Sequence, residues 1–565
     1  MARRTSLDDS DAILTQQLLD SLNLGAQDAP ASSVQAKLAI HGVVIGVQND
    51  LARVSGLRHA TVGSVVAVRD GDGQFCCHGL VLMLETKLVH VALLKATTET
   101  LPVTKGMHVE LHHEQLEIPG SVAAFTGAVI DPLGRALSMD ESRAQHEPKE
   151  RIHVGWGAQS VPGLMQRVPL SLPFETGFVA LDCLHPMAHG HRFGIFGPRH
   201  AGKTRLALDV MVHQVARAKE LGHVPPHIVY VCIGKSLARI ARIREVLKTT
   251  ETLSHTTIIA AHDCDSPVLQ YIAPFTGCAV AEYMMQHSRS PHSVVVYDDL
   301  ATHTSVVEGF VHSLHLPRAA RTSLSAHAVL LERSGQFQGV SNERTGPSVT
   351  SLVLVDTPAA SEKPSDLQEG ISSLVDDFVC LDPSSPDFPP LNVLTPGGSV
   401  RGPPFQSAAR WTFISRLRAR INAAARVKEN VEVACKLGLE PEPEDAETLE
   451  FLALVEQFFN TSTLIGQKGT IESELEILVA AMFLSNVNVV KLPTEPLNLW
   501  EFVRQVITRL MRKENEDIWI QLTTQERTSA WSKRLEANVA KVVDEELERL
   551  KLAKKQKSTK IASIT

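Results

Sequence analysis

The chain has 565 residues, far more than one ordinary domain of roughly 100 to 200 residues, so several domains with separate cores are expected. Apolar residues make up 44% and charged residues 21%, a mixture that excludes a fibrous or mainly disordered protein. The formal net charge of -8 gives no general reason to expect a nucleic acid partner, because phosphate binding needs a concentrated basic surface.

The cysteines are scattered and include no CxxC pair, so the sequence predicts neither a disulfide framework nor a zinc site. They are Cys76, Cys77, Cys183, Cys232, Cys264, Cys278, Cys380 and Cys435. No apolar run reaches the ~18 residues of a membrane-spanning helix, so any membrane association is expected to come through partners. The first residues combine two arginines with early aspartates, which is atypical of a mitochondrial transit peptide.

The N-terminal third is predicted to hold an extension and a small β domain. Residues 1–34 include the helical run "SDAILTQQLLDSL". In residues 35–128, short alternating runs are separated by Gly/Asp turns such as "DGDG" at 70–73: "HGVVIGVQN", "ARVSGL", "GSVVAVRD" and "CCHGLVLMLE". Regular short strands with such turns are typical of a β-barrel or sandwich.

Residues 129–406 are predicted to form an α/β domain with a mostly parallel sheet. Strand-like runs alternate with segments of helical period: "FGIFG", "HIVYVCIG", "TTIIAA", "SVVVYDD", "HAVLLE" and "TSLVLVDT". In "RLALDVMVHQVARAKELG", apolar residues such as Leu208, Met211 and Val215 fall on one helical stripe. Residues 356–405 are rich in Pro, Ser and Gly, and an ordered but irregular connection is expected there.

Residues 407–525 lose the strand pattern and are predicted to form a helical domain, followed by a charged helical tail at 526–565. The tail carries an apolar stripe that includes Leu535, Val539 and Val542, and it ends in lysines. Two interpretations remain open: a solvated helix with a frayed end, or a helix that docks on another surface.

The stretch "GPRHAGKT" fits the pattern GxxxxGK[ST], with a strand before it and an amphipathic helix after it. Backbone N–H groups of such a loop turn inward on phosphates, the lysine reaches the terminal phosphates, and the Ser/Thr hydroxyl binds Mg²⁺. The sequence therefore predicts an ATP or ADP site with Mg²⁺ held at Thr204. The predicted phosphate-binding residues are Gly197, Pro198, Arg199, His200, Ala201, Gly202, Lys203 and Thr204.

A second half of the site is predicted at "SVVVYDD", an apolar strand that ends in aspartates. Asp298 is the predicted outer-sphere ligand of Mg²⁺, with Asp299 beside it. Hydrolysis also needs a group that orients the attacking water, and in ring-forming ATPases a glutamate follows the strand after the loop helix. Lys235 and Ser236 occupy that place here, which predicts a site that binds nucleotide without splitting it.

These residues, taken together, resemble the alpha-subunit family of F-type ATP synthases. Matching stretches cover roughly residues 35 to 515 in the same order; they include "VVIGVQNDLARVSGLR", "PFETGFVALDCLHPMAHGHRFGIFGPRHAGKT", "SPVLQYIAPFTGCAVAEYM" and "VVVYDDLATH". Arg199 fits the alpha pattern, whereas His200 replaces a glutamine of that pattern.

The resemblance implies an N-terminal β-barrel, a central RecA-like nucleotide-binding domain and a C-terminal helical domain. It also implies a non-catalytic, regulatory subunit of a proton-driven rotary ATP synthase. Such subunits alternate with catalytic beta subunits in a ring of six around a central stalk gamma subunit, and their N-terminal arm contacts the peripheral stalk. The implied location is the matrix side of the mitochondrial inner membrane, with the membrane reached only through partner subunits.

Two further site residues follow from the resemblance alone. The family's arginine finger, which reaches the neighbouring subunit's catalytic site, best matches Arg401 in "SVRG"; Arg410 is the reserve, and a plain surface arginine is the alternative. Gln467 in "IGQKGT" lies near a family contact to adenine. The family's "RP" reads Phe388 and Pro389 here, so the resemblance to its adenine site is weaker than the resemblance to its phosphate site.

Two other functional classes share this core: an RNA-translocating hexameric helicase of the Rho type, and a secretion ATPase. Both would need their own catalytic glutamate. Lys235 weighs against both, and an aromatic content of 5% weighs against an RNA groove. A purely structural subunit is opposed by intact Lys203, Thr204 and Asp298.

Overall fold

The computed structural model describes most of the chain between residues 41 and 562. The described ranges are 41–48, 50–94, 102–137, 150–156, 158–313, 323–339, 346–357, 366–382, 407–436, 442–460, 470–487, 499–524 and 530–562. The chain divides into two compact units. Unit 1 comprises Met1–Gly163, His227–Arg289 and Tyr297–Arg333, and unit 2 comprises Leu164–Pro226, Ser290–Val296 and Ser334–Thr565.

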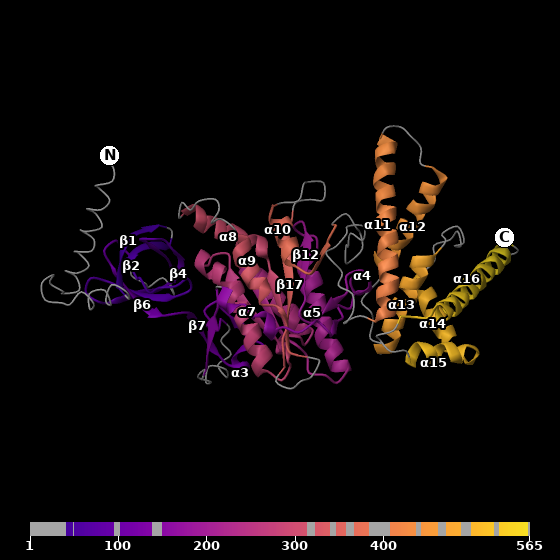
Figure 1. Ribbon diagram of the computed structural model, residues 1–565, viewed down its shortest axis with the longest axis horizontal. Coiled ribbons are helices and arrows are strands. Elements are labelled where there is room, and N and C mark those ends of the chain that lie inside the picture. The colour runs from indigo at the N-terminus through magenta and orange to yellow at the C-terminus, as the bar shows by residue number, and fades with distance from the viewer. Residues whose placement is uncertain are drawn as a thin grey trace. The chain divides into compact units, whose positions relative to one another are not determined.

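Unit 1 begins with a closed antiparallel β-barrel, as the sequence predicts (Figure 1). Its strand order is β1-β2-β5-β4-β3-β6, and β6 pairs with β1 to close it. The strands are β1 (His41–Gln48), β2 (Leu51–Gly56), β3 (Val65–Arg69), β4 (Phe75–Leu84), β5 (Val89–Leu94) and β6 (His108–His113). Inward-facing valines, among them Val44, Val66 and Val91, are fully buried and form its core. Closure removes the exposed strand edges that an open sheet would leave.

The rest of unit 1 contains parallel strands with helices between them. β13 (His227–Lys235) pairs with β14 (Thr256–His262), and β14 pairs with β8 (Val129–Ile130), all in parallel. The helices are α3 (Val122–Phe125), α6 (Leu237–Thr249), α7 (Pro267–His287), α8 (Leu300–Ser313) and α9 (Ser323–Glu332). A separate antiparallel pair joins β7 (Leu116–Gly120) to β9 (Glu150–Val154). The near-continuous burial of β13 and β14 is what a strand covered on both faces requires.

Unit 2 holds the remaining strands of the α/β region. β12 (Arg192–Gly197) lies between β17 (Ser348–Asp356) and β18 (Asp377–Cys380), parallel to both. Short strands β10 (Pro173–Phe174) and β11 (Met187–Ala188) pair with each other, and β16 (Gly335–Gln336) pairs with β17. The helices here are α4 (Val179–Leu184), α5 (Lys203–Glu220) and α10 (Asp366–Leu374). β15 (His292–Asp298) starts in unit 2 and ends in unit 1.

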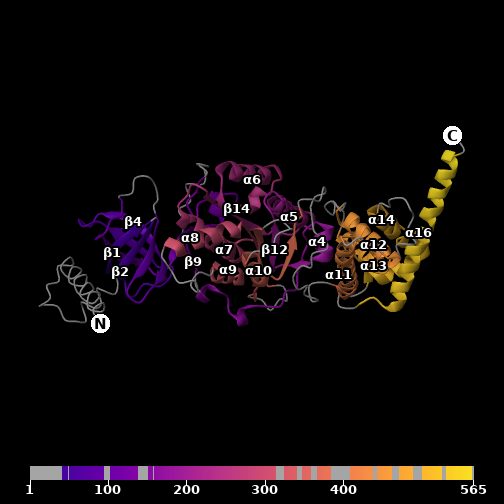
Figure 2. The same cartoon turned by 90° about the horizontal axis from the view of Figure 1, so that it is seen from above.

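The C-terminal part of unit 2 is helical, which confirms the predicted C-terminal helical domain. The helices are α11 (Ala408–Lys436), α12 (Pro443–Asn460), α13 (Thr470–Asn486), α14 (Leu499–Leu510), α15 (Glu516–Thr524) and α16 (Lys533–Ala562). α16 is one long helix that packs on α14 and α15 (Figure 1), and its length is seen in Figure 2. Leu535, Val539 and Val542 of its apolar stripe are buried, so this part of the tail docks within its own unit.

Two sequence predictions about local structure are wrong. "HAVLLE" was expected as a strand but forms the end of α9, where His327, Leu330 and Leu331 are buried at helical spacing. A short apolar run does not by itself distinguish a buried strand from a buried helix. The segment 356–405 was expected to be irregular, yet it contains α10 and β18. No helix in the described ranges is long and apolar enough to cross a membrane.

A buried ion pair ties α9 to α7 and to the loop after β9. Arg333 directly follows α9 and is 2% exposed; its Nη2 lies 2.6 Å from Glu282 Oε2, and its Nε donates to Glu282 Oε1 at 2.8 Å. Its Nη1 donates to the Gly155 carbonyl oxygen at 2.9 Å. The guanidinium therefore has charged and neutral acceptors on two other elements.

We expect Arg333→Met to destabilise the protein by about 3 kcal/mol, because it leaves the Glu282 carboxylate without its counter-ion. The apparent melting temperature from scanning calorimetry measures the loss. Arg151→Met is the matched control, since Arg151 is 68% exposed beside Glu117 and such a pair contributes ~1 kcal/mol at most. Equal melting temperatures for the two variants would contradict this role of Arg333.

Candidate functional site

The predicted phosphate-binding loop connects β12 to α5 in unit 2. α5 begins at Lys203, and Gly202 before it has a φ of 93°, a left-handed conformation that favours glycine. His200 also lies in the left-handed region, with a φ of 67°, and its side chain is exposed. The first N–H groups of an 18-residue helix therefore follow a tight turn at the end of a buried strand.

Lys203 is held inside this loop by three oxygen atoms. Its Nζ donates to the carbonyl oxygens of Gly197 and Pro198, each at 2.7 Å, and lies 2.8 Å from Asp356 Oδ1. The side chain is 7% exposed, whereas Arg199, whose Nε lies 3.5 Å from Asp356 Oδ2, is 85% exposed. One carboxylate thus contacts both cations of the loop.

The loop fits a nucleotide polyphosphate by the chemistry of its donors. A helix N-terminus, a buried ammonium group and an exposed guanidinium group all favour negative charge at the same place. The Asp356 carboxylate balances these cations in the structure, and a phosphate group would compete with it for Lys203. The Thr204 hydroxyl, one residue into α5, is the type of hard oxygen donor that Mg²⁺ prefers.

The predicted Asp298 lies in unit 1, in a compact charged cluster with Asp299 and Lys235. Lys235 Nζ lies 2.9 Å from Asp298 Oδ1 and 2.7 Å from Asp299 Oδ2. Tyr230 donates from its hydroxyl to Asp298 Oδ2 at 2.7 Å, and the Thr302 N–H donates to Asp299 Oδ1 at 2.7 Å. Both oxygens of the Asp298 carboxylate therefore have protein partners.

The protonation of this cluster follows from its geometry. Burial alone would lower the pKa of the Lys235 ammonium, but the charges of Asp298 and Asp299 outweigh it and raise the pKa above its ordinary value. Burial would raise the pKa of Asp299, yet Lys235 and the Thr302 N–H hold it below its ordinary value. Lys235 is thus protonated throughout the neutral range and cannot act as a general base.

Lys235 ends β13, and the first acid after it in the sequence is Glu245, on the following helix α6. The Glu245 side chain is exposed. The described α6 therefore has no acid in the residues next to Lys235. Orienting an attacking water requires a hydrogen-bond acceptor near the γ-phosphate, and an ammonium group offers only donors. Lys235 therefore provides a positive charge at the end of β13 and no acceptor for a water proton.

The remaining predicted site residues are those of the arginine finger and of the adenine contact. Arg401 and Gln467 lie outside the described residues, as do Phe388 and Pro389. Arg410, the reserve finger, lies on α11, and its Nη2 donates to the Asp182 carbonyl oxygen at the end of α4. That contact joins its guanidinium to α4 of its own unit.

Sequence reasoning missed Asp356 as a residue of the phosphate-binding loop. It ends the apolar strand "TSLVLVD", so the signal was the same one that identified Asp298: an acid at the carboxyl end of a buried strand. The register of β12 against β17 pairs Gly197 with Asp356 and brings the carboxylate to the loop.

Comparison with known proteins agrees with this geometry. Residues 177–395 match the family model described as "ATP synthase alpha/beta family, nucleotide-binding domain". This part of the chain is therefore similar to the nucleotide-binding domain of that family.

Curated relatives match a longer part of the chain than the domain does. The chain is 30% identical to "ATP synthase subunit alpha" of Ehrlichia ruminantium over 330 residues, which is 58% of this chain and 61% of the relative. It is 31% identical to "ATP synthase subunit alpha" of Caldanaerobacter subterraneus over 322 residues, which is 56% of this chain and 58% of the relative. The matches thus span less than two thirds of each relative's length.

We expect Lys235→Met to destabilise the protein by about 3 kcal/mol near pH 7, because two buried carboxylates lose their counter-ion. The depressed pKa of Asp299 contributes stability above the ordinary carboxyl pKa of about 3.9, and that stability is lost as the pH falls through the folded value. The deficit of the variant is therefore complete from pH ~7 down to pH ~4 and shrinks as the pH falls below ~4.

Scanning calorimetry across that pH range checks the Lys235 prediction. Lys248→Met, which removes an exposed lysine from the last turn of α6, is the matched control and should show no such trend. A deficit that grows on acidification would contradict the proposed ion cluster.

Proposed function

We propose that this chain is the non-catalytic, regulatory nucleotide-binding alpha subunit of a proton-driven rotary ATP synthase. It binds ATP or ADP with Mg²⁺ at the loop Gly197–Thr204 and does not hydrolyse it. The observation that carries the proposal is Lys235: a protonated lysine, paired with Asp298 and Asp299, stands where a catalytic member of such a ring needs an acid.

The proposed partners follow from the family of the domain and from the names of the relatives. Catalytic beta subunits alternate with this subunit in a ring of six, a gamma subunit occupies the central stalk, and the peripheral stalk contacts residues 1–34. No nucleic acid is involved. The proposed location is the matrix side of the mitochondrial inner membrane, with membrane contact made by partner subunits.

Arg401 is the proposed arginine finger, and Gln467 the proposed contact to the adenine side. A planar guanidinium placed from outside can stabilise the charge of a neighbour's transition state without belonging to the catalytic chain. The alternatives, a Rho-type helicase or a secretion ATPase, both require self-sufficient hydrolysis, which the ammonium group of Lys235 disfavours.

The isolated chain is expected to bind ATP·Mg²⁺ in calorimetric titration and to show negligible turnover in a phosphate-release assay. Lys203→Met should weaken binding at least tenfold, because it removes the buried cation of the loop. Lys219→Met, at the exposed C-terminal end of the same helix, is the matched control and should bind normally. Robust turnover by the isolated chain would overturn the proposal.

Arg401→Ala is expected to leave nucleotide binding by this chain unchanged and to reduce turnover of the assembled ring by roughly 10³-fold or more, the range of known arginine fingers. The measurement uses the chain co-expressed and co-purified with its catalytic partner. Arg426→Ala, an exposed arginine of α11, serves as the control. Full ring activity with Arg401→Ala would place the finger elsewhere.

A further inference from the structure

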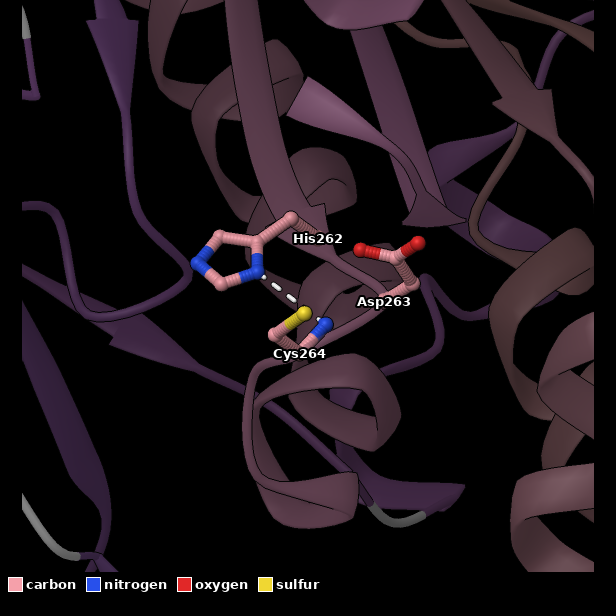
Figure 3. Close-up of side chains that lie close together, drawn as sticks. All are labelled: His262, Asp263 and Cys264. Atoms are coloured by element: carbon pink, nitrogen blue, oxygen red, sulfur yellow. Dashed lines mark hydrogen bonds between the residues drawn. The ribbon is translucent and has the colours of Figure 1, made fainter. Parts of the chain in front are cut away.

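A cluster of three chemically different ligand groups lies in the turn that follows β14, outside the phosphate-binding loop. His262, Asp263 and Cys264 are consecutive, and their ligand atoms all lie within 4.8 Å of one another (Figure 3). Asp263 and Cys264 are exposed, while His262 is partly buried. One nitrogen, one carboxylate and one sulfur donor therefore face the same small volume at the surface of unit 1.

The imidazole of His262 is already oriented for coordination. Its Nδ1 accepts the Cys264 N–H at 3.2 Å, so this nitrogen carries no proton and its lone pair points toward Cys264. Its Nε2 lies 2.8 Å from Asp265 Oδ1, so the ring proton sits on the far side, against a carboxylate. A carboxylate that holds the distal N–H of a ligating histidine is the usual arrangement in metal sites.

The backbone of the turn is also fixed. The N–H of His262 donates to Asp265 Oδ2 at 2.8 Å, and the N–H of Asp263 donates to the Lys235 carbonyl oxygen at 3.2 Å. Gln270, on the first turns of α7, donates from Nε2 to the carbonyl oxygens of His262 and Asp265 at 3.3 and 3.2 Å. A turn tethered to β13 and α7 loses little freedom when it takes up an ion.

We propose that His262, Asp263 and Cys264 bind a divalent transition-metal ion of the Zn²⁺ type. The ligands are His262 Nδ1, a carboxylate oxygen of Asp263 and Cys264 Sγ, and exposure of the turn leaves a fourth position for water. The proposal does not depend on the function proposed above, because none of these residues belongs to the phosphate-binding loop or to the ion cluster of Lys235.

The donor set selects the class of metal. Thiolate and imidazole ligands favour Zn²⁺ and its neighbours in the first transition row, whereas Mg²⁺ and Ca²⁺ favour oxygen ligands alone. Binding replaces the Cys264 N–H···Nδ1 hydrogen bond by a metal–nitrogen bond. It also requires the Cys264 thiol to lose its proton to solvent, so the metal–sulfur bond forms with release of one H⁺.

This site escaped the sequence analysis because its ligands are adjacent. Familiar zinc patterns place cysteines or histidines two to five residues apart, and "HDCD" has no such spacing. Only the tight turn after β14, closed by the N–H of Asp265 on the His262 carbonyl oxygen at 3.1 Å, brings three neighbouring side chains to one side.

Cobalt titration of the full chain tests the proposal, because Co²⁺ occupies zinc sites and a thiolate ligand gives an intense near-ultraviolet charge-transfer band. We expect saturation at one equivalent and loss of the band when Zn²⁺ is added. Cys264→Ser should abolish the band, and Asp265→Asn should weaken Co²⁺ binding about tenfold or more. Cys435→Ser is the matched control, since Cys264 and Cys435 are the two exposed cysteines.

A second measurement needs no variant. Alkylation of Cys264 by iodoacetamide, followed by peptide mass spectrometry, should slow in the presence of Zn²⁺ and not of Mg²⁺, while alkylation of Cys435 should be unaffected. Absence of a thiolate band in the unmodified protein would overturn the proposal, as would a band that survives Cys264→Ser or disappears with Cys435→Ser. Histidine-only binding elsewhere on the surface would give no thiolate band.

Discussion

The proposed function depends on one interaction, the contact of Lys235 with Asp298 and Asp299. Two carboxylates that are at most 3% exposed cannot both stay ionised without a cation beside them. Lys235, the last residue of β13, supplies that positive charge. Replacing it by an acid would place three carboxylates together, which would demand either a bound metal or a captured proton.

A second ion pair between a lysine and an aspartate lies at the phosphate-binding loop. Lys203 and Asp356 neutralise each other at 2.8 Å, yet Asp356 is 29% exposed and also contacts Arg199. The first pair is buried and has further partners in Tyr230 and Thr302, whereas the second lies at an accessible loop. A polyphosphate can therefore compete with Asp356 for Lys203, whereas Lys235 remains paired with Asp298 and Asp299.

Much of the fold could be predicted because the sequence patterns are strong and local. The runs that became β1, β13 and β17 combine β-branched residues with turn signals, and the loop at Gly197–Thr204 combines a motif with its strand and helix. The misses share one cause, which is that the deciding contacts join residues distant in sequence. "HAVLLE" ends α9, which packs on α7 and α8, and its buried residues fall at helical spacing.

The same cause explains the residues of the site that were missed. Asp356 lies more than 150 positions from Lys203 in the sequence, and only the β12–β17 register brings them together. The identity of Lys235 at the end of its strand could be read directly, but its two ion pairs could not. Arg401 and Gln467 were chosen by resemblance and lie outside the described residues, so they remain predictions.

Nucleotide bound at Gly197–Thr204 would stabilise the folded chain whether or not the nucleotide is hydrolysed. A ligand that binds only the folded state stabilises it by RT ln(1 + [L]/Kd), about 2.7 kcal/mol when the ligand is at 100 times its Kd. That gain needs Lys203 and the N-terminus of α5 but no catalytic group. The proposed non-hydrolysing role requires only that bound ATP keep its γ-phosphate. The ammonium of Lys235 fits that requirement, since it balances Asp298 and Asp299 and cannot take a proton from water.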